Sequence, residues 1–400
     1  MKKNNVSLLN LLIEKVELPE SAYEKAKKRY EDLGEWFKRD TSTLKDNNVH
    51  IYPQGSFMLG TAIRPILHED DYDLDLVCKI GSGVSKKSHT QKSVKEMVGN
   101  ELKKYIKKRG IKNPLESKRR CWTIHYLDDI NFHMDILPAI SADPDQVLEL
   151  YQAMDTLGIE ESVANQTSRL AIEITDNKEM NYNTITKDWN ISNPEGYGVW
   201  FENRMSVTDK RMVLSKAEVD ELPIYKRKST LQRVIQLLKR HRDIMYAEND
   251  EQKPISIIIT TLAARAYNGE DNISVALNNI LQKMPNLINH HEPFVPNPAK
   301  PEEDFADKWN MEEYKDLELE NNFHLWIEQA KVDFGLLTTS TEPNLIKRKI
   351  QSNFDVVISE QIIKTHLSNS SSNHQDQNPT EDNEVYIIEN PPRPWGTPRK

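Results

Sequence analysis

Three aspartates in two short segments have the residue type and spacing for metal-ion chemistry. Asp73 and Asp75 lie in the segment DYDLDLV, and Asp135 lies further along the chain in NFHMDIL. Because side chains alternate across a strand, Asp73 and Asp75 would share one face while the apolar residues between them face a core. Adjacent carboxylates repel unless a cation lies between them, and oxygen ligands favour magnesium or manganese. We therefore predict that these three aspartates are the metal ligands and catalytic residues of a two-metal site.

A two-metal carboxylate site is typical of phosphoryl transfer. One metal ion lowers the pKa of an attacking hydroxyl, and the other holds a triphosphate and stabilises the departing pyrophosphate. The alternative for any single aspartate is a solvated surface group or a turn residue, and we interpret Asp70 and Asp71 in this way. His133 would share the face of Asp135, but a lone histidine is more often structural than a ligand, so we leave it out of the site.

A glycine–serine pair precedes the first two aspartates, in the segment YPQGSFMLGT. Gly55 would let a phosphate approach the backbone closely, and Ser56 offers an N–H group and a hydroxyl. Alone the pair would indicate only a turn. Its position just before the strand with two carboxylates favours phosphate binding by Gly55 and Ser56, with the adjoining Gln54 as a further candidate.

The composition limits the class of protein. The chain has 400 residues, enough for two lobes with a cleft between them, and a net charge of −9. An excess of acidic residues is unfavourable for stable nucleic-acid binding. Cys78 and Cys121 form no CxxC pair, which is typical of a cytoplasmic protein. No run approaches the ~18 apolar residues of a membrane span, and the polar N-terminal segment is a poor secretory signal.

The pattern of apolar residues predicts an α/β sheet lobe followed by a helical lobe. We assign residues 1–203 to the first lobe, including an amphipathic helix at 19–40, and residues 204–367 to the second. Residues 368–400 are rich in Ser, Asn, Gln, Asp and Pro, so we expect a disordered tail. The expected strands are Val49–Tyr52, Tyr72–Ile80, Cys121–Tyr126 and Asn131–Ile136. The expected further helices are Ser93–Arg109, Thr230–Met245, Pro254–Tyr267, Glu320–Asp333 and Glu342–Ser352.

Two polar residues of the second lobe are candidates for phosphate contacts. Lys239 lies at the edge of the apolar stripe of helix Thr230–Met245, where a lysine can extend from a packed helix into a cleft. Ser256 would lie in the first turn of the next helix, beside unsatisfied backbone N–H groups. The alternatives are a solvated charge near a helix C-terminus for Lys239 and simple helix capping for Ser256.

The ordered set of motifs resembles the polymerase-β-like nucleotidyltransferase superfamily. More narrowly, QGSFMLGTAIRP followed by DDYDLDL is similar to the bacterial CD-NTases, and LQRVIQLLKRHRD and KPISIIITTLAARAY in the second lobe are similar as well. CD-NTases are relatives of cyclic GMP–AMP synthase and oligoadenylate synthetase that make cyclic oligonucleotide signals in CBASS anti-phage systems. The resemblance covers roughly residues 18–365. One departure is a longer connection between Ser56 and Asp73 than in the compact members of the superfamily.

The resemblance implies a bilobal fold, with helix 19–40 bracing both lobes and the active site between them. It implies that Gly55 and Ser56 hold a donor triphosphate, that Lys239 and Ser256 contact nucleotide phosphates, and that magnesium or manganese is the cofactor. The substrates would be nucleoside triphosphates, ATP among them. The product would be a cyclic di- or trinucleotide second messenger.

Other functions remain open on the residues alone. A linear or tRNA-type nucleotidyltransferase would share the three acids, and so would a toxin or antitoxin nucleotidyltransferase that modifies a macromolecule. A non-catalytic nucleotide sensor would leave a costly acid cluster unused. We expect a monomer without a membrane partner. The segment Pro391–Trp395 of the tail is a candidate recognition site for a regulatory or conjugation partner.

Overall fold

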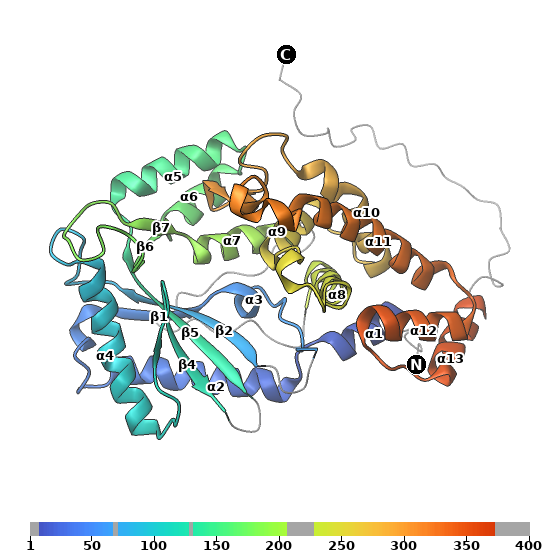
Figure 1. The fold of residues 1–400 in the computed structure, drawn as a ribbon, viewed down its shortest axis with the longest axis horizontal. Helices are drawn as coiled ribbons and strands as arrows, with labels where there is room; N and C mark the ends of the chain where they lie inside the picture. The colour runs from blue at the N-terminus through green and yellow to red at the C-terminus, as the bar shows by residue number, and fades with distance from the viewer. Residues whose placement is uncertain (1–7, 67–70, 128–130, 206–227, 373–400) are drawn as a thin grey trace, which may run out of the picture.

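The computed structural model describes residues 8–66, 71–127, 131–205 and 228–372, which form a sheet lobe and a helical lobe (Figure 1). The main sheet has the order β1-β2-β5-β4-β3, with β6 also paired to β5 and β7 paired to β6. Strands β2 and β5 are parallel, and the other pairs are antiparallel. The strands are β1 (Val49–Pro53), β2 (Tyr72–Ile80), β3 (Glu116–Ser117), β4 (Trp122–Tyr126), β5 (Phe132–Ser141), β6 (Ile172–Ile174) and β7 (Asn190–Ser192).

Alternation along β2 and β5 gives the sheet one apolar face. Leu74 and Leu76 of β2 and Met134 of β5 are fully buried in the core of the sheet lobe. Helices α2 (Glu20–Lys38) and α4 (Gln91–Arg109) contribute to the same core. In Figure 1, α2 runs along the lower edge of the sheet and α4 lies to its left. The two-residue period predicted from the sequence is therefore confirmed for both aspartate strands.

The helical lobe has a larger core of its own. Its helices surround α8 (Thr230–Met245), whose ends match the sequence prediction. The other helices of this core are α1 (Leu8–Val16), α5 (Pro144–Thr156), α6 (Glu161–Ser168), α7 (Pro194–Met205), α9 (Ser256–Ala266), α10 (Ile273–Lys283), α11 (Leu319–Thr339), α12 (Pro343–Phe354) and α13 (Glu360–Ser372). A small two-stranded sheet of β8 (Pro296–Asn297) and β9 (Lys300–Asp304) follows α10 and precedes α11 in the sequence.

The two cores divide the chain differently from the predicted boundary at residue 203. Helices α1, α5 and α6 and most of α7 precede that boundary, yet their apolar residues belong to the helical core, among them Leu12, Met154 and Phe201. The chain therefore crosses between the lobes more than once. The sequence did not indicate this, because the apolar pattern of a helix shows which face is buried but not which core that face joins.

The C-terminal end of the described chain is helical. Helix α13 continues to Ser372, past residue 367 where the helical lobe was expected to end. The rest of the predicted tail, including Pro391–Trp395, lies outside the described residues. Among the helices that the structure describes, none combines the length and apolar character needed to cross a membrane.

Candidate active site

The three predicted acids meet on one face of the sheet. The parallel register of β2 and β5 pairs Asp75 with Asp135 and places Asp73 one step along the same face. On the other side of β5, Thr123 of β4 pairs with Asp135 and donates a hydrogen bond from Oγ1 to its Oδ1 over 2.5 Å. Adjacent strands lie about 4.8 Å apart, so carboxylates in register can share a metal ion.

Electrostatic repulsion within this cluster favours the binding of a cation. Burial, with added repulsion from Asp73 and Asp135, raises the pKa of Asp75 to about 7. Among the described residues, the lysine that opposes this repulsion is Lys118, whose Nζ lies 3.9 Å from Asp135 Oδ1. One lysine cannot neutralise three carboxylates, whereas divalent cations with oxygen ligands can. The donor set therefore fits a divalent metal.

The glycine–serine segment lies directly against Asp75. Helix α3 (Gly55–Met58) follows β1, and Gln54 N–H donates to the Asp75 carbonyl oxygen over 2.8 Å. Gly55 has a φ of +61°, and a Cβ atom there would lie 2.8 Å from Asp75 Oδ2. Ser56 comes next in the first turn of α3. Only glycine fits this position, because the backbone is left-handed and the carboxylate is close.

Helix α8 holds the segment that follows Ser56 from the helical lobe. Its polar side chains at i, i+4, i+7 and i+8 form one stripe that faces the sheet lobe. They donate to the backbone carbonyl oxygens of consecutive or near-consecutive residues, which fixes the path of this loop. The bonds are Gln232 to Leu59 (2.9 Å), Gln236 to Ala62 (2.8 Å), Lys239 to Thr61 (3.2 Å) and Arg240 to Arg64 (2.6 Å).

Lys239 contacts the far end of residues 55–61, the segment that we call the phosphate loop. Its Nζ donates to both the carbonyl and the hydroxyl oxygen of Thr61, at 3.2 and 3.1 Å, and the side chain is buried. Burial, together with the nearby Arg242, lowers the pKa of Lys239 to about 7. Thr61 N–H in turn donates to the Ser56 carbonyl oxygen over 2.9 Å. Lys239 therefore supports the loop in this structure, and its contact with a phosphate stays a prediction.

Ser256 lies in the first turn of α9, as the sequence predicts, although the helix begins at Ser256 itself and not at the expected Pro254. Its hydroxyl accepts a hydrogen bond of 3.1 Å from Arg242, which also donates to the Pro254 carbonyl oxygen. Arg242 is the link between Ser256 and Lys239, whose pKa it lowers. The binding of a nucleotide phosphate by Ser256 stays a prediction.

Two residues that we set aside from the sequence border the acid cluster. His133 Nε2 lies 2.6 Å from Asp71 Oδ2, and His133 Nδ1 lies 3.7 Å from Asp73 Oδ1. Asp71, His125 and His133 each place a possible ligand atom within 4.8 Å of the others, so the three could hold a metal ion. Asp71 is therefore more than a turn residue, whereas Asp70 lies outside the described residues. The sequence did contain a signal for His133, because strand alternation places it on the same face as Asp135.

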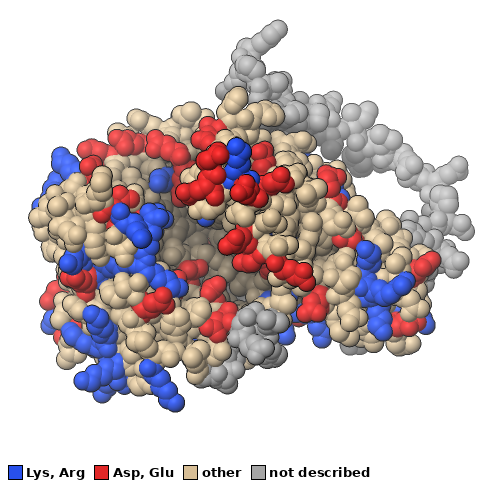
Figure 2. All heavy atoms as spheres, viewed as in Figure 1, with Lys and Arg blue, Asp and Glu red and all other residues tan. Residues whose placement is uncertain are grey.

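The face shown in Figure 2 is hollowed between the two lobes. Lys and Arg gather on the left of the hollow, and Asp and Glu lie along its right and lower edges. The segregation of charge agrees with a site that binds both phosphate and metal ions.

A mixed sheet that carries three clustered carboxylates beside a tight glycine–serine loop defines a nucleotidyltransferase. Comparison with known proteins is more specific. Residues 49–138 match the family model described as cyclic GMP–AMP synthase DncV-like, nucleotidyltransferase domain. The c-di-GMP synthase of Roseivirga ehrenbergii is 32% identical over 340 residues, which cover 81% of this chain and 79% of that protein. The chain belongs to the CD-NTase family of nucleotidyltransferases.

Further relatives agree with this assignment. The cyclic dinucleotide synthase CdnG of Bradyrhizobium diazoefficiens is 23% identical over 77% of this chain and 71% of that protein. The structure of CdnG in complex with GTP superposes with a TM-score of 0.59 at 19% identity, over 93% of this chain and 99% of that one. Vibrio cholerae DncV with ATP and GTP gives a TM-score of 0.53 at 14% identity, over 90% and 96%. The bilobal α/β fold predicted from the sequence is confirmed.

Proposed function

We propose that this enzyme joins two molecules of GTP into cyclic di-GMP. The observation that carries the chemistry is the pairing of Asp75 with Asp135, with Asp73 on the same face and Gly55 against Asp75. The choice of GTP is supported by the c-di-GMP synthase with 32% identity and by the GTP complex of CdnG. Shared fold alone would not specify the nucleotide.

Asp73, Asp75 and Asp135 would hold divalent metal ions, magnesium or manganese. Such ions, when bound, neutralise charge on the triphosphate and acidify the attacking hydroxyl. The carboxylate of Asp75 is kept beside Asp135 by the register of two central strands, so the ligands are positioned before any substrate arrives.

The remaining residues position the donor nucleotide. The backbone at Gly55 and the N–H and hydroxyl of Ser56 would bind its phosphates, with Gln54 beside them. Lys239 and Ser256 would reach the same phosphates from the helical lobe. A ribose hydroxyl of the second nucleotide then attacks the α-phosphorus, the P–O bond to pyrophosphate breaks, and the hydroxyl proton leaves to solvent. A second attack within the linear product releases another pyrophosphate and closes the ring.

The enzyme would act in the bacterial cytoplasm as the signal-producing component of an anti-phage system. This part of the proposal rests on family membership. Phage challenge of bacteria that carry the complete operon should show protection that is lost in the variant Asp73→Asn/Asp75→Asn. If this variant protected the bacteria as well as the wild type does, defence would not depend on the synthase activity.

The direct test is product analysis with the purified protein. The four ribonucleoside triphosphates with magnesium or manganese, followed by phosphatase and mass spectrometry, should yield phosphatase-resistant cyclic di-GMP. Linear, phosphatase-sensitive products would instead favour a polymerase, and transfer only to an added macromolecule would favour a modifying enzyme. The variant Asp73→Asn/Asp75→Asn should abolish the product.

A matched control separates the acid site from the general loss of negative charge. Asp40 and Asp46 are exposed on the same lobe, outside the acid cluster. The variant Asp40→Asn/Asp46→Asn should keep wild-type turnover. Turnover retained by Asp73→Asn/Asp75→Asn, or lost equally in both variants, would contradict the assignment of the metal ligands.

A further inference from the structure

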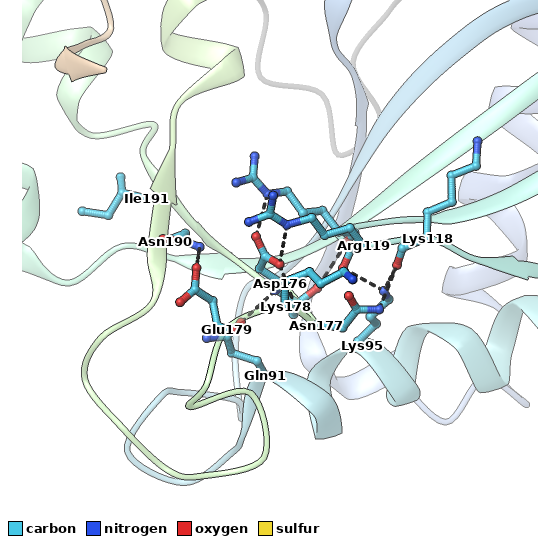
Figure 3. Close-up of polar contacts among 12 residues, drawn as sticks. Gln91, Lys95, Lys118, Arg119, Asp176, Asn177, Lys178, Glu179, Asn190 and Ile191 are labelled. Atoms are coloured by element: carbon cyan, nitrogen blue, oxygen red, sulfur yellow. Dashed lines mark hydrogen bonds and ion pairs between the residues drawn. The ribbon is translucent and has the colours of Figure 1, made fainter. Parts of the chain in front are cut away.

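A turn of three consecutive basic residues lies beside the acid site, between β3 and β4. Lys118 extends toward Asp135, while Arg119 and Arg120 extend toward Asp176, which follows β6. Figure 3 shows Lys118 and Arg119 pointing in different directions. We call these three residues the basic turn. Lys118 takes part in the acid site, whereas neither arginine belongs to the predicted site or to the phosphate loop.

A buried carboxylate holds the two arginines. Asp176 is completely buried, and its Oδ1 and Oδ2 accept hydrogen bonds from Arg119 Nε (2.8 Å) and Arg120 Nε (3.0 Å). Burial alone would raise the pKa of Asp176, but the bonds from Arg119, the Lys178 backbone and Arg120 outweigh it and keep the pKa below its usual value. Asp176 therefore stays ionised and fixes both guanidinium groups.

The backbone of the basic turn is fixed as well. Lys95 Nζ, buried beneath the turn, donates to the carbonyl oxygens of Lys118 and Arg119. Asn177 N–H also donates to the Arg119 carbonyl oxygen over 3.0 Å. Figure 3 shows these donors converging on the turn from below. A loop that only carried solvated charge would not need buried donors to shape it.

The charges of this cluster do not balance. Arg119 and Arg120 share one carboxylate, and their side chains are 54% and 49% exposed while that of Asp176 is fully buried. Each arginine uses Nε for Asp176, so the terminal N–H groups take no part in these bonds. Glu179, the second acid that interacts with Arg119, accepts a hydrogen bond from Asn190. An excess of fixed, half-exposed guanidinium charge is suited to a polyanion, above all a phosphate.

The sheet order places the basic turn opposite the phosphate loop. Gly55 follows β1, which pairs with β2 on the side away from β5. The basic turn precedes β4, which pairs with β5 on the side away from β2. The acids of β2 and β5 lie between them. A nucleotide that attacks a donor held at Gly55 must approach from the other side of the acids.

We propose that Arg119 and Arg120 bind the 5′-triphosphate of the acceptor nucleotide, the one that supplies the attacking hydroxyl. This inference rests on the proposed function, since an acceptor nucleotide exists only if two nucleotides are joined. Lys118 lies closer to Asp135 and balances the acid site, so the arginines carry the contact.

The test is binding of an unreactive nucleotide, guanosine 5′-(α,β-methylene)triphosphate, measured by calorimetry with magnesium. The wild-type enzyme should bind two molecules per chain, and Arg119→Gln/Arg120→Gln should bind one, or the second at least about tenfold more weakly. The triple variant with Asp176→Asn should behave in the same way, and it avoids leaving a buried carboxylate without partners. Lys107→Gln/Lys108→Gln, which removes two exposed charges from the end of α4, should match the wild type.

The outcomes distinguish this inference from the proposed function. If the arginine variants keep wild-type stoichiometry and affinity, the inference is overturned, whatever the enzyme makes. If the second site is lost in these variants while the wild type makes no cyclic di-GMP, the phosphate site stands and the product assignment fails. Loss of affinity in the lysine control to the same extent would show a general charge effect and overturn the inference.

Discussion

The two sides of the acid cluster are built in different ways. On the β1 side, Gly55 and Ser56 offer mainly backbone, crowded against Asp75 and held from behind by α8. On the β4 side, Arg119 and Arg120 offer charged side chains anchored by a single buried carboxylate. A backbone site depends on space and on dihedral angles, whereas a side-chain site depends on charge. The backbone site should be intolerant of any added atom, whereas the side-chain site should lose affinity gradually as its charges are removed.

Among the variants that compare the two sides of the acid cluster, the largest effect is expected from Gly55→Ala. The new Cβ would lie 2.8 Å from Asp75 Oδ2, on a backbone with φ of +61°, so the loop or the carboxylate must move. A shift of about 1 Å in a catalytic group costs on the order of 100-fold, and we expect at least that loss in kcat/KM. Gly110→Ala is the control: it has a φ of +67° but nothing within 4 Å. It should reduce stability and leave kcat/KM unchanged.

Lys239→Met should have the next largest effect, and it tests whether the β1 side depends on support from α8. Loss of the bonds to Thr61 loosens the phosphate loop, and we expect a decrease in kcat/KM of about tenfold. The same variant tests how the protonation of Lys239 affects the stability of the folded protein. The folded-state pKa of Lys239, about 7, lies below the usual value for lysine. Between these two values the unfolded chain binds one more proton than the folded chain, so wild-type stability rises with pH.

Urea unfolding at several pH values between 7 and 10 would measure this contribution. The free energy of unfolding of the wild type should increase relative to Lys239→Met, by at most about 1.4 kcal/mol per pH unit. Parallel pH profiles for the two proteins would contradict a buried, largely neutral lysine.

A smaller effect is expected from Asp176→Asn on the β4 side. The asparagine keeps the shape but not the charge, so Arg119 and Arg120 lose the group that orients them. We expect KM for GTP to increase about fivefold, with kcat within about twofold, because positioning of the acceptor weakens while the acids are untouched. A fall in kcat at unchanged KM would place Asp176 in the chemistry of the acid site instead.

The smallest effect is expected from deletion of residues 373–400. Polar segments of this composition contribute little to a cleft, so synthesis by the purified enzyme should stay within about twofold of wild type. Trp395→Ala should reduce capture of any partner that the tail recruits. A large loss of synthesis on deletion would show that the tail is part of the enzyme.

The sequence was sufficient where a pattern is local. Alternation identified the faces of Asp73, Asp75 and Asp135, and the helical period of α8 set its ends correctly. Strand β5 extends to Ser141, past the expected end at Ile136. A proline inside a strand is usually a sign that the strand ends. Pro138 is tolerated because it lies between the part of β5 that pairs with β4 and the part that pairs with β6.

The sequence was insufficient where partners are distant. Three adjacent basic residues indicate only a solvated surface, and Asp176, the residue that orders two of them, comes 57 residues after Arg119. The polar stripe of α8 had the right spacing for a second interface, but its partners are backbone atoms of a loop more than 170 residues earlier. The short strands β6 and β7 have too few residues for a period to be visible.

The crossing of the chain between the lobes has a consequence for how the molecule melts. Helix α1 packs in the helical core and α2 in the sheet core, while α8 bonds across to residues 59–64. Neither lobe can lose its structure without exposing apolar surface or carbonyl groups of the other. Calorimetry should therefore show one cooperative transition, and neither lobe expressed alone should be a stable fragment.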